Sequence, residues 1–189
     1  MPFVTQSPPN PAAASPLNFS PREFRDALGM FATGVAIVTA RGEDGVPVGM
    51  TINSFNSVSL DPPLVLWSLA QRSSLLGVLT ATRHCAIHVL TAEQRPLAER
   101  FATRGIDRWT GVAHHPGLHG VPVIEGAAGV FECFTRSQYA EGDHTIFVGE
   151  VLRCSHRRGA SPLLYHGGMF YTEHPLGRLS PKAAGPMGK

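Results

Sequence analysis

The chain has 189 residues, a length that predicts one domain, and its formal net charge is only +2 at pH 7. Charged residues make up 16% of the composition and hydrophobic residues 43%, which excludes a wholly disordered chain and a coiled coil. The small positive charge gives no support for a nucleic-acid partner. No apolar run reaches transmembrane length and no secretory signal precedes Arg22, so we expect a cytoplasmic protein without a membrane partner.

Both ends of the chain have the composition of tails. Residues 1–21 contain six prolines and an alanine triplet, which is typical of a disordered or extended arm. From Pro175 onward, proline and glycine recur without apolar periodicity, so residues 175–189 are expected to form a flexible C-terminal tail. The sequence therefore predicts one folded domain over residues 22–174.

The domain is expected to open with a helix. The segment Ser20–Glu23 has the capping-box pattern, with proline at the first helical position. Phe24, Leu28 and Phe31 follow at the i, i+4, i+7 spacing of an apolar helix face. Gly34 is expected to end this pattern.

Strands are expected to dominate the rest of the domain. The segments that are short, rich in β-branched or aromatic residues, and bounded by Gly, Pro or Asp are Val35–Thr39, Val46–Ile52, Leu64–Leu69, Cys85–Leu90, Val130–Thr135 and Thr145–Arg153. Two further helices are predicted over Ser74–Thr82 and Glu93–Thr103. Closely spaced strands with few helices favour an antiparallel sheet closed into a barrel over a βαβ fold.

Several well-defined site motifs are absent from the sequence. It contains no dinucleotide-binding G-x-G-x-x-G, no P-loop, no H-E-x-x-H and no G-x-S-x-G, and its three cysteines show no C-x-x-C spacing. His114, His115 and His119 lie close together, but Pro116 and Gly117 indicate a loop and no clear fourth ligand follows. We interpret this segment as a polar surface loop and predict no metal site.

A dense polar run between two apolar strands is the most informative feature. Its small hydroxyl and amide side chains are Thr51, Asn53, Ser54, Asn56, Ser57 and Ser59. Such side chains offer donors and acceptors without bulk, as a planar polar ring or a phosphate requires, and Gly49 allows a ligand close to the backbone. The alternative is an Asn/Ser-rich loop that hydrogen-bonds its own backbone.

The same stretch carries a family resemblance. Residues 49–66 read G-M-T-I-N-S-F-N-S-V-S-L-D-P-P-L-V-L, which resembles the short-chain flavin reductases, the reductase components of two-component flavin-dependent monooxygenases. Four further blocks resemble that family in the same order, with His88 where asparagine is usual: Phe24–Val38, His84–Leu90, Gly142–Val151 and Pro162–Gly168.

The resemblance implies a mainly β protein, a split β-barrel with a few flanking helices that forms a homodimer. It implies binding of FMN or FAD, with NADH or NADPH as hydride donor. The cofactor-binding residues that it assigns are Val48, Gly49, Met50, Thr51, Asn53, Ser54, Ser68, Leu69, Ala70, Ser73, Ser74, Arg100, Phe101, Asp143 and Tyr165. His144 is the candidate catalytic residue on the nicotinamide side, oriented by Asp143.

Two of these assignments have structural alternatives. Ser73 precedes the helix predicted to start at Ser74, where its hydroxyl, the free amides and the helix dipole favour a phosphate, but it also suits a simple N-cap. Arg100 and Phe101 lie on an expected amphipathic helix, where Phe101 equally suits the core.

The predicted function is that of an NAD(P)H:flavin oxidoreductase, which supplies reduced flavin to a separate monooxygenase. A flavin-dependent oxidase on a related barrel and a non-catalytic flavin or haem carrier are the alternatives. The sequence leaves open the choice between FMN and FAD, the choice between NADH and NADPH, and the identity of the oxygenase.

Overall fold

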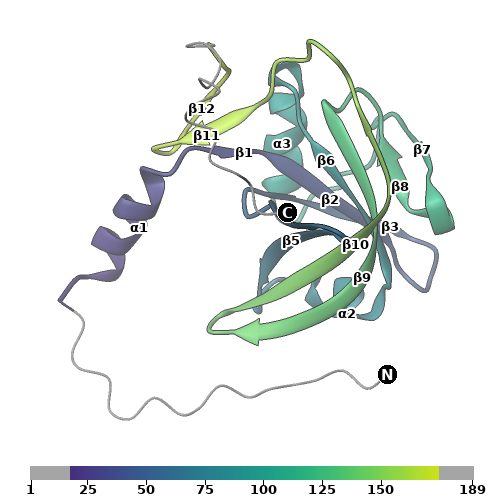
Figure 1. Ribbon diagram of the computed structural model, residues 1–189, viewed down its shortest axis with the longest axis horizontal. Coiled ribbons are helices and arrows are strands. Elements are labelled where there is room, and N and C mark those ends of the chain that lie inside the picture. Colours follow the sequence, from purple (N-terminus) through teal and green to yellow (C-terminus); the bar gives the residue numbers. More distant parts are fainter. Residues whose placement is uncertain (1–17, 175–189) are drawn as a thin grey trace.

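The computed structural model describes residues 18–174 of the chain (Figure 1). The predicted tail over residues 175–189 lies outside the described residues, as do residues 1–17 of the predicted N-terminal tail. Helix α1 (Pro21–Gly29) confirms the expected opening helix, but it ends at Gly29, before Phe31 and before the stop predicted at Gly34. Its capping box is formed, because the Glu23 amide donates to the Ser20 hydroxyl at 3.2 Å and the Ser20 amide donates to the Glu23 carboxylate at 2.7 Å.

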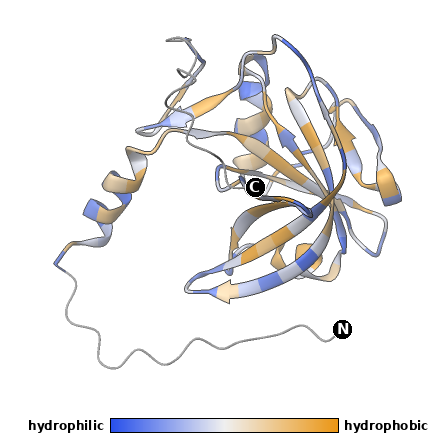
Figure 2. Ribbon diagram, in the orientation of Figure 1, coloured by the Kyte–Doolittle hydropathy of each residue, from blue (hydrophilic) through white to orange (hydrophobic). Residues whose placement is uncertain are grey.

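Helix α1 contacts little of the rest of the chain. No residue of the helix is buried, and its apolar face remains in solvent: Phe24 is 52% exposed and Leu28 57%. Figure 1 shows the helix standing beside the body of the molecule, and Figure 2 shows apolar residues on it. The i, i+4, i+7 spacing therefore marks a face that the described chain leaves uncovered.

One antiparallel sheet forms the body of the described chain, with the strand order β3-β2-β6-β9-β10-β5-β4. Its strands are β2 (Ala36–Arg41), β3 (Pro47–Ile52), β4 (Asn56–Leu60), β5 (Pro63–Ala70), β6 (His84–Val89), β9 (Gly129–Glu141) and β10 (His144–His156). The sheet curls around the core while β3 and β4 end the hydrogen-bonded ladder, so the barrel is split rather than closed (Figure 1). This is the mainly β, split-barrel fold that the family resemblance implies, whereas the closed sheet expected from the strand spacing is not formed.

Smaller elements complete the fold. Strands β1 (Thr33–Gly34), β11 (Leu164–His166) and β12 (Met169–Tyr171) form a second sheet, and β7 (His114–Pro116) pairs with β8 (Pro122–Ile124). The helical segments after α1 are α2 (Leu76–Ala81), η1 (Ala92–Gln94), α3 (Arg95–Ala102) and η2 (Leu118–Gly120). No described helix has the length and apolarity needed to cross a membrane.

The sequence predicts each long strand but not its full extent. Strands β9 and β10 run to Glu141 and start at His144, well beyond the predicted Thr135 and before Thr145, because their hairpin pairing continues through polar residues. The strands of two or three residues were not predicted, because so few residues show no alternation. Strand β4 (Asn56–Leu60) was not predicted either, because its residues belong to the run of small polar side chains that resembles a loop. The segment of His114, His115 and His119 is also corrected: it forms β7 and the η2 turn rather than an irregular loop.

The histidines of that segment do not gather as a metal site. His119 stacks on His84, with ring centroids 3.8 Å apart, while the Nδ1 of His114 donates to the Val112 carbonyl at 2.8 Å. Among residues 18–174, no group of three or more His, Cys, Asp or Glu side chains is arranged to hold a metal ion.

Two apolar clusters stabilise the sheet. Between its curled faces, Trp67 and Phe147 stack with ring centroids 4.2 Å apart. Behind β2, the second cluster packs Phe101 of α3 against Ile37 and Leu90, all fully buried. Burial of side chains of this size contributes about 1.5–3 kcal/mol each, so α3 is held firmly on the sheet.

His88 connects three strands inside the protein. It is fully buried, its Nδ1 lies 3.0 Å from the Ile37 carbonyl of β2, and its Nε2 lies 3.0 Å from the Ile124 amide of β8. The amide must donate to Nε2, so the Nδ1 proton donates to the carbonyl and the ring is neutral. Loss of solvent around the ring lowers its pKa from 6.5 to about 4.

We predict that His88 makes the protein sensitive to mild acid. Between pH 6.5 and about 4, the unfolded chain binds a proton at this residue that the folded chain does not bind. The free energy of unfolding should therefore be fully present above pH 6.5 and should fall by about 3 kcal/mol on acidification to pH 4. Urea unfolding across this pH range measures the change.

The control for this experiment is the exposed His156. The variant His88→Asn should show a flatter pH profile, and His156→Asn should keep the wild-type profile. An identical slope in a folded His88→Asn variant would refute the assignment. If that variant does not fold, nitrogen-15 NMR can follow the titration of the His88 ring in the wild-type protein. Titration near pH 6.5 would also refute the assignment.

Candidate functional site

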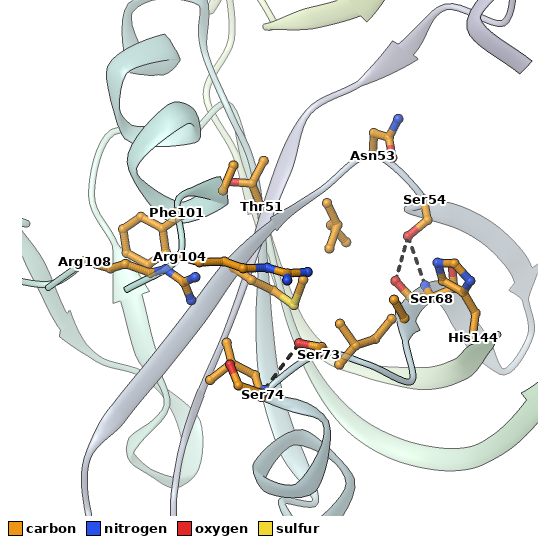
Figure 3. Close-up of a pocket in the computed structure, with 16 residues that line it drawn as sticks. Thr51, Asn53, Ser54, Ser68, Ser73, Ser74, Phe101, Arg104, Arg108 and His144 are labelled. Carbon is orange, nitrogen blue, oxygen red and sulfur yellow. Dashed lines mark hydrogen bonds between the residues drawn. The ribbon is translucent and has the colours of Figure 1, made fainter. Parts of the chain in front are cut away.

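A cavity of about 300 Å³, called the central cavity here, lies where the ends of several elements meet (Figure 3). Strand β3 and the connection to β4 form one wall, the end of β5 and the segment before α2 form another, and the C-terminal end of α3 closes it. Predicted site residues that line it are Met50, Thr51, Asn53, Ser54, Ser68, Leu69, Ala70, Ser73, Ser74, Phe101 and His144.

Two serines join the β3–β4 connection to β5 at one end of this cavity. The Ser68 amide donates to the Ser54 hydroxyl at 3.0 Å, and that hydroxyl donates to the Ser68 carbonyl at 3.2 Å (Figure 3). The connection is thereby fixed without a helix or strand of its own. The neighbouring Asn53 amide is exposed and has no partner within residues 18–174, so it is free to bind a ligand.

His144 lies at the same end, where β5 ends and the antiparallel strand β10 begins. It pairs with Ala70 across the sheet, and its Nδ1 lies 2.6 Å from the Asp143 carboxylate. The hydrogen bond to His144, the charge of that ring and the charge of Arg72 lower the pKa of the Asp143 carboxyl, which is therefore ionised near neutral pH. An ionised carboxylate can only accept, so Nδ1 carries the proton toward it and Nε2 remains available to the cavity.

The turn that carries Asp143 is itself held in place. The Gln71 amide, just after β5, donates to the Asp143 carbonyl at 2.8 Å. The β9–β10 turn is thus attached to the chain that leads toward α2. His144 is positioned by strand pairing, by a carboxylate and by a fixed turn, although its side chain is nearly half exposed.

Two arginines define the opposite end of the central cavity. Arg108 donates to the Thr103 carbonyl at 2.8 and 3.0 Å and to the Gly49 carbonyl at 3.0 Å. Partial burial and the nearby charge of Arg104 lower the pKa of Arg108, and neither guanidinium forms an ion pair with a described carboxylate. Two cations without a counter-charge at one cavity attract an anion.

Ser73 and Ser74 face these arginines across the cavity (Figure 3). The Ser73 hydroxyl accepts a bond from the Leu75 amide at 3.3 Å, so its own proton remains free to donate. The predicted helix start at Ser74 is wrong by two residues, because α2 begins at Leu76 and has no side-chain cap. With only six residues in α2, the positive potential comes from the arginines rather than from a helix terminus.

Arg104 and Arg108 line the central cavity but are not among the site residues predicted from the sequence, which include Arg100 instead. Arg100 donates to the Thr110 carbonyl at 2.8 Å and does not line the central cavity. The available signal was the spacing R-G-I-D-R directly after the predicted end of the helix, where two arginines flank a glycine. Residues just after α3 return toward the cavity, whereas Arg100 lies on a face of the helix turned away from it.

Gly49 allows the Phe101 side chain, rather than a ligand, to approach the backbone of β3 closely. A Cβ at this position would lie 2.7 Å from the Phe101 ring and 3.2 Å from the Val38 carbonyl. Phe101 is fully buried, which confirms its place in the core, and it also lines the central cavity, where its contact with a cofactor stays a prediction. Thr51 also helps to hold α3 on the sheet, because its hydroxyl donates to the Ala98 carbonyl at 2.7 Å.

Besides Arg100, four predicted residues fall outside the central cavity. Val48 and Gly49 line an adjoining cavity of about 300 Å³, which we call the Trp109 cavity. Tyr165 of β11 lines a third one of about 450 Å³, the Tyr165 cavity, which shares Thr51 and Asn53 with the central cavity. Asp143 acts from outside through its bond to His144.

The central cavity therefore has an asymmetric chemistry. One end offers two arginines and two serine hydroxyls, the middle is apolar, and the other end offers Asn53, backbone groups and the free Nε2 of His144. This arrangement is complementary to an elongated ligand with an anionic group at one end and a flat, polar-edged ring at the other. The fold and the cavity together define a split-barrel protein that binds such a small molecule.

The chain belongs to the flavin reductase like domain family, whose profile matches residues 28–174. It is 49% identical over 162 residues to the FMN reductase (NADH) SmoA of Agrobacterium fabrum. The match covers 86% of this chain and 91% of that protein. The reductase component of a flavin-dependent trigonelline monooxygenase from Acinetobacter baylyi is 39% identical over 80% of this chain, which spans 48% of that relative.

A solved structure agrees with these relatives. The NADH:FAD oxidoreductase SgcE6 of Streptomyces globisporus, determined in complex with NAD and FAD fragments, has a TM-score of 0.75 and 39% identity to this chain. The match covers 86% of this chain and 94% of that one. The homologues are thus NADH-dependent flavin reductases and reductase components of monooxygenases.

Proposed function

We propose that this protein is an NADH-dependent flavin reductase, which transfers a hydride to FMN or FAD and releases the reduced flavin to a separate monooxygenase. The observation that carries the proposal is the central cavity, with uncompensated arginines at one end and His144 at the other, in a chain of this family. NADH is the preferred donor in the proposal because relatives at 49% and 39% identity are named for it; NADPH is the alternative.

The residues present fit a flavin. Its phosphate would be held by Arg104, Arg108, Ser73 and Ser74, because these groups supply charge and hydroxyl donors without a competing carboxylate. The edge of its ring would meet Asn53 and the backbone of the adjoining connection, while the apolar side chains of Met50 and Leu69 line the slot between the two ends.

The bound flavin supplies an acceptor for the hydride of the nicotinamide. The protein needs no nucleophile for this transfer, and its task is to hold two rings in contact and to exclude water. His144 is placed to contact the nicotinamide through Nε2, because Asp143 fixes the other nitrogen. Donors at Asn53 would stabilise the negative charge that develops on the flavin edge.

A mixing experiment separates this function from its alternatives. Rapid anaerobic bleaching of flavin absorbance on addition of NADH is expected of the reductase. No bleaching with either nicotinamide would favour the non-catalytic carrier. Substrate-driven bleaching without any nicotinamide would favour the oxidase.

We also propose that the working form is a homodimer. The uncovered face of α1, with Phe24, Leu28 and the following Phe31 all more than half exposed, is apolar surface of the kind that stable interfaces bury. Light scattering should give twice the chain mass, and the double variant Phe24→Ser with Leu28→Ser should give a monomer. A wild-type monomer that binds flavin normally would contradict the proposal.

The first prediction on flavin binding uses Arg104, which makes no hydrogen bond within residues 18–174 that a substitution would break. Arg104→Ala should raise the Kd for FMN about tenfold or more, since a charge-assisted bond contributes about 1.5–3 kcal/mol. The Kd for riboflavin, which lacks the phosphate, should stay within twofold. Quenching of flavin fluorescence measures both.

Arg100→Ala is the matched control, because Arg100 has the same charge but lies outside the central cavity. It should leave the affinities for both flavins unchanged. Equal weakening of FMN and riboflavin in Arg104→Ala would show that Arg104 supports the fold rather than a phosphate. An unchanged Kd for FMN would remove Arg104 from the site.

The second prediction concerns His144. Because its ring is held at the cavity by Asp143, His144→Ala should leave flavin affinity within twofold and slow flavin reduction about 10- to 100-fold. Asp143→Asn, which removes the ionised partner, should give a smaller effect of the same kind. Stopped-flow reduction of the flavin-saturated protein by NADH measures the rate.

The pattern of effects separates a nicotinamide contact from a structural residue. A structural His144 would lower the melting temperature and weaken flavin binding while leaving the rate near normal in the loaded fraction. A reduction rate within twofold of wild type at saturating NADH, with unchanged NADH affinity, would reject the role proposed for His144.

A further inference from the structure

The two arginines at the end of the central cavity lie in a segment without regular secondary structure. Residues 103–112, called the arginine loop here, follow α3 and precede β7, and none of them belongs to a helix or a strand. Gly105 and Gly111 within the loop have positive φ, so the chain bends sharply at both. Neither helical nor sheet pairing fixes Arg104 and Arg108, and their positions depend on the side chains that hold the loop.

Asp107 organises the middle of the arginine loop through three hydrogen bonds. One carboxylate oxygen accepts from the Trp109 amide at 2.8 Å and from the Thr110 amide at 3.3 Å, and the other accepts from the Thr110 hydroxyl. These bonds, first that of the Thr110 hydroxyl, lower the pKa of the Asp107 carboxyl, which is therefore ionised near neutral pH. The three bonds close a turn around Arg108, which lies between Asp107 and Trp109 in the sequence.

Arg108 is held both by this turn and by its own side chain. Its backbone belongs to the turn that Asp107 closes, while its guanidinium donates to the Thr103 carbonyl and to the Gly49 carbonyl of β3. The next residue, Trp109, is half-buried and packs against the apolar cluster behind β2. The place of the Arg108 guanidinium at the central cavity therefore depends on the shape of the turn.

The charge of Asp107 opposes the function proposed for this end of the cavity. A carboxylate one residue away from a phosphate-binding guanidinium repels a phosphate. Among the described residues, no ion pair joins Asp107 to Arg104 or Arg108, and its oxygens accept from the loop instead. A favourable effect of Asp107 on phosphate binding must therefore come from geometry.

We propose that Asp107 is a positioning residue for flavin binding, which orders the arginine loop so that Arg108 faces the flavin phosphate before the ligand arrives. This inference rests on the proposed function. A guanidinium that is already ordered loses less conformational freedom on binding than a mobile one. Asp107 thus favours phosphate binding through geometry and opposes it through charge, and the two effects predict opposite changes in affinity when the carboxylate is removed.

The test compares the Kd of FMN with that of riboflavin, which lacks the phosphate, by quenching of flavin fluorescence. Asp107→Ala should raise the Kd for FMN about tenfold, because the arginine must then be immobilised on binding, and should leave the Kd for riboflavin within about twofold. Asp107→Asn should keep the wild-type Kd for FMN or lower it. Its amide group can still bond to Trp109 and Thr110, while the repelling charge is removed.

Asp44→Ala is the matched control. It removes a carboxylate that accepts from the Val46 amide at 2.9 Å in the β2–β3 turn, outside the central cavity and the Trp109 cavity, and it should change neither Kd. A second readout needs no ligand. In nitrogen-15 NMR of the flavin-free protein, the Arg108 Nε proton, which donates to Thr103, should be protected from exchange in the wild type and in Asp107→Asn, and should lose this protection in Asp107→Ala.

Three results would overturn the inference. If Asp107→Ala binds FMN as tightly as the wild type or more tightly, Asp107 acts through its charge alone. Equal weakening of FMN and riboflavin would indicate general damage to the site. If Asp107→Ala does not fold, Thr110→Val, at an exposed residue, removes one bond of the turn and should raise the Kd for FMN alone by about threefold. An unchanged Kd in that variant is the third result.

The wild-type protein separates failure of this inference from failure of the proposed function. If it binds FMN no more tightly than riboflavin, the phosphate site of the proposed function is rejected, and the inference with it. If it prefers FMN but Asp107→Ala retains that preference, only the role of Asp107 is rejected.

Discussion

The candidate site depends on the antiparallel pairing of β5 with β10, which extends to the last residue of β5 and the first residue of β10. Ala70 and His144 are partners at that end, so the strand that supplies Leu69 to the cavity also sets the place of the histidine. The serine pair between Ser54 and Ser68 attaches the β3–β4 connection to the same strand end. Backbone pairing therefore brings together residues far apart in sequence without requiring a long-range contact between their side chains.

The charge is distributed unevenly along the central cavity, with its positive groups at the arginine end. Described carboxylates near the cavity are engaged elsewhere: Asp143 with His144, and Asp107 with its own loop. The guanidinium of Arg108 is bonded only to carbonyls, which orient it without cancelling its charge. In the proposed complex, the anionic end of the ligand would lie at the arginines and its ring end would lie beside His144.

The sequence predicts much of the fold and the uncharged part of the candidate site. The strands are short runs rich in β-branched and aromatic residues, and small polar side chains are concentrated from Thr51 to Ser59, so both give local signals. The arginines could not be found in this way, because which of Arg100, Arg104 and Arg108 faces the cavity depends on where α3 ends. The predicted start of α2 is wrong for a related reason. Serines are common as helix caps but are equally compatible with a non-helical segment that precedes the helix.

The contact between Gly49 and Phe101 constrains how this protein can change over evolutionary time. Strand β3 and helix α3 meet there with no room for another carbon atom, so neither position can accept a new residue independently of the other. A larger side chain on the strand requires a smaller one on the helix, and that exchange would move the wall shared by the core and the central cavity. Substitutions at these two sites should therefore be epistatic, and a shift in ligand shape along this lineage would pass through a paired replacement rather than a single one.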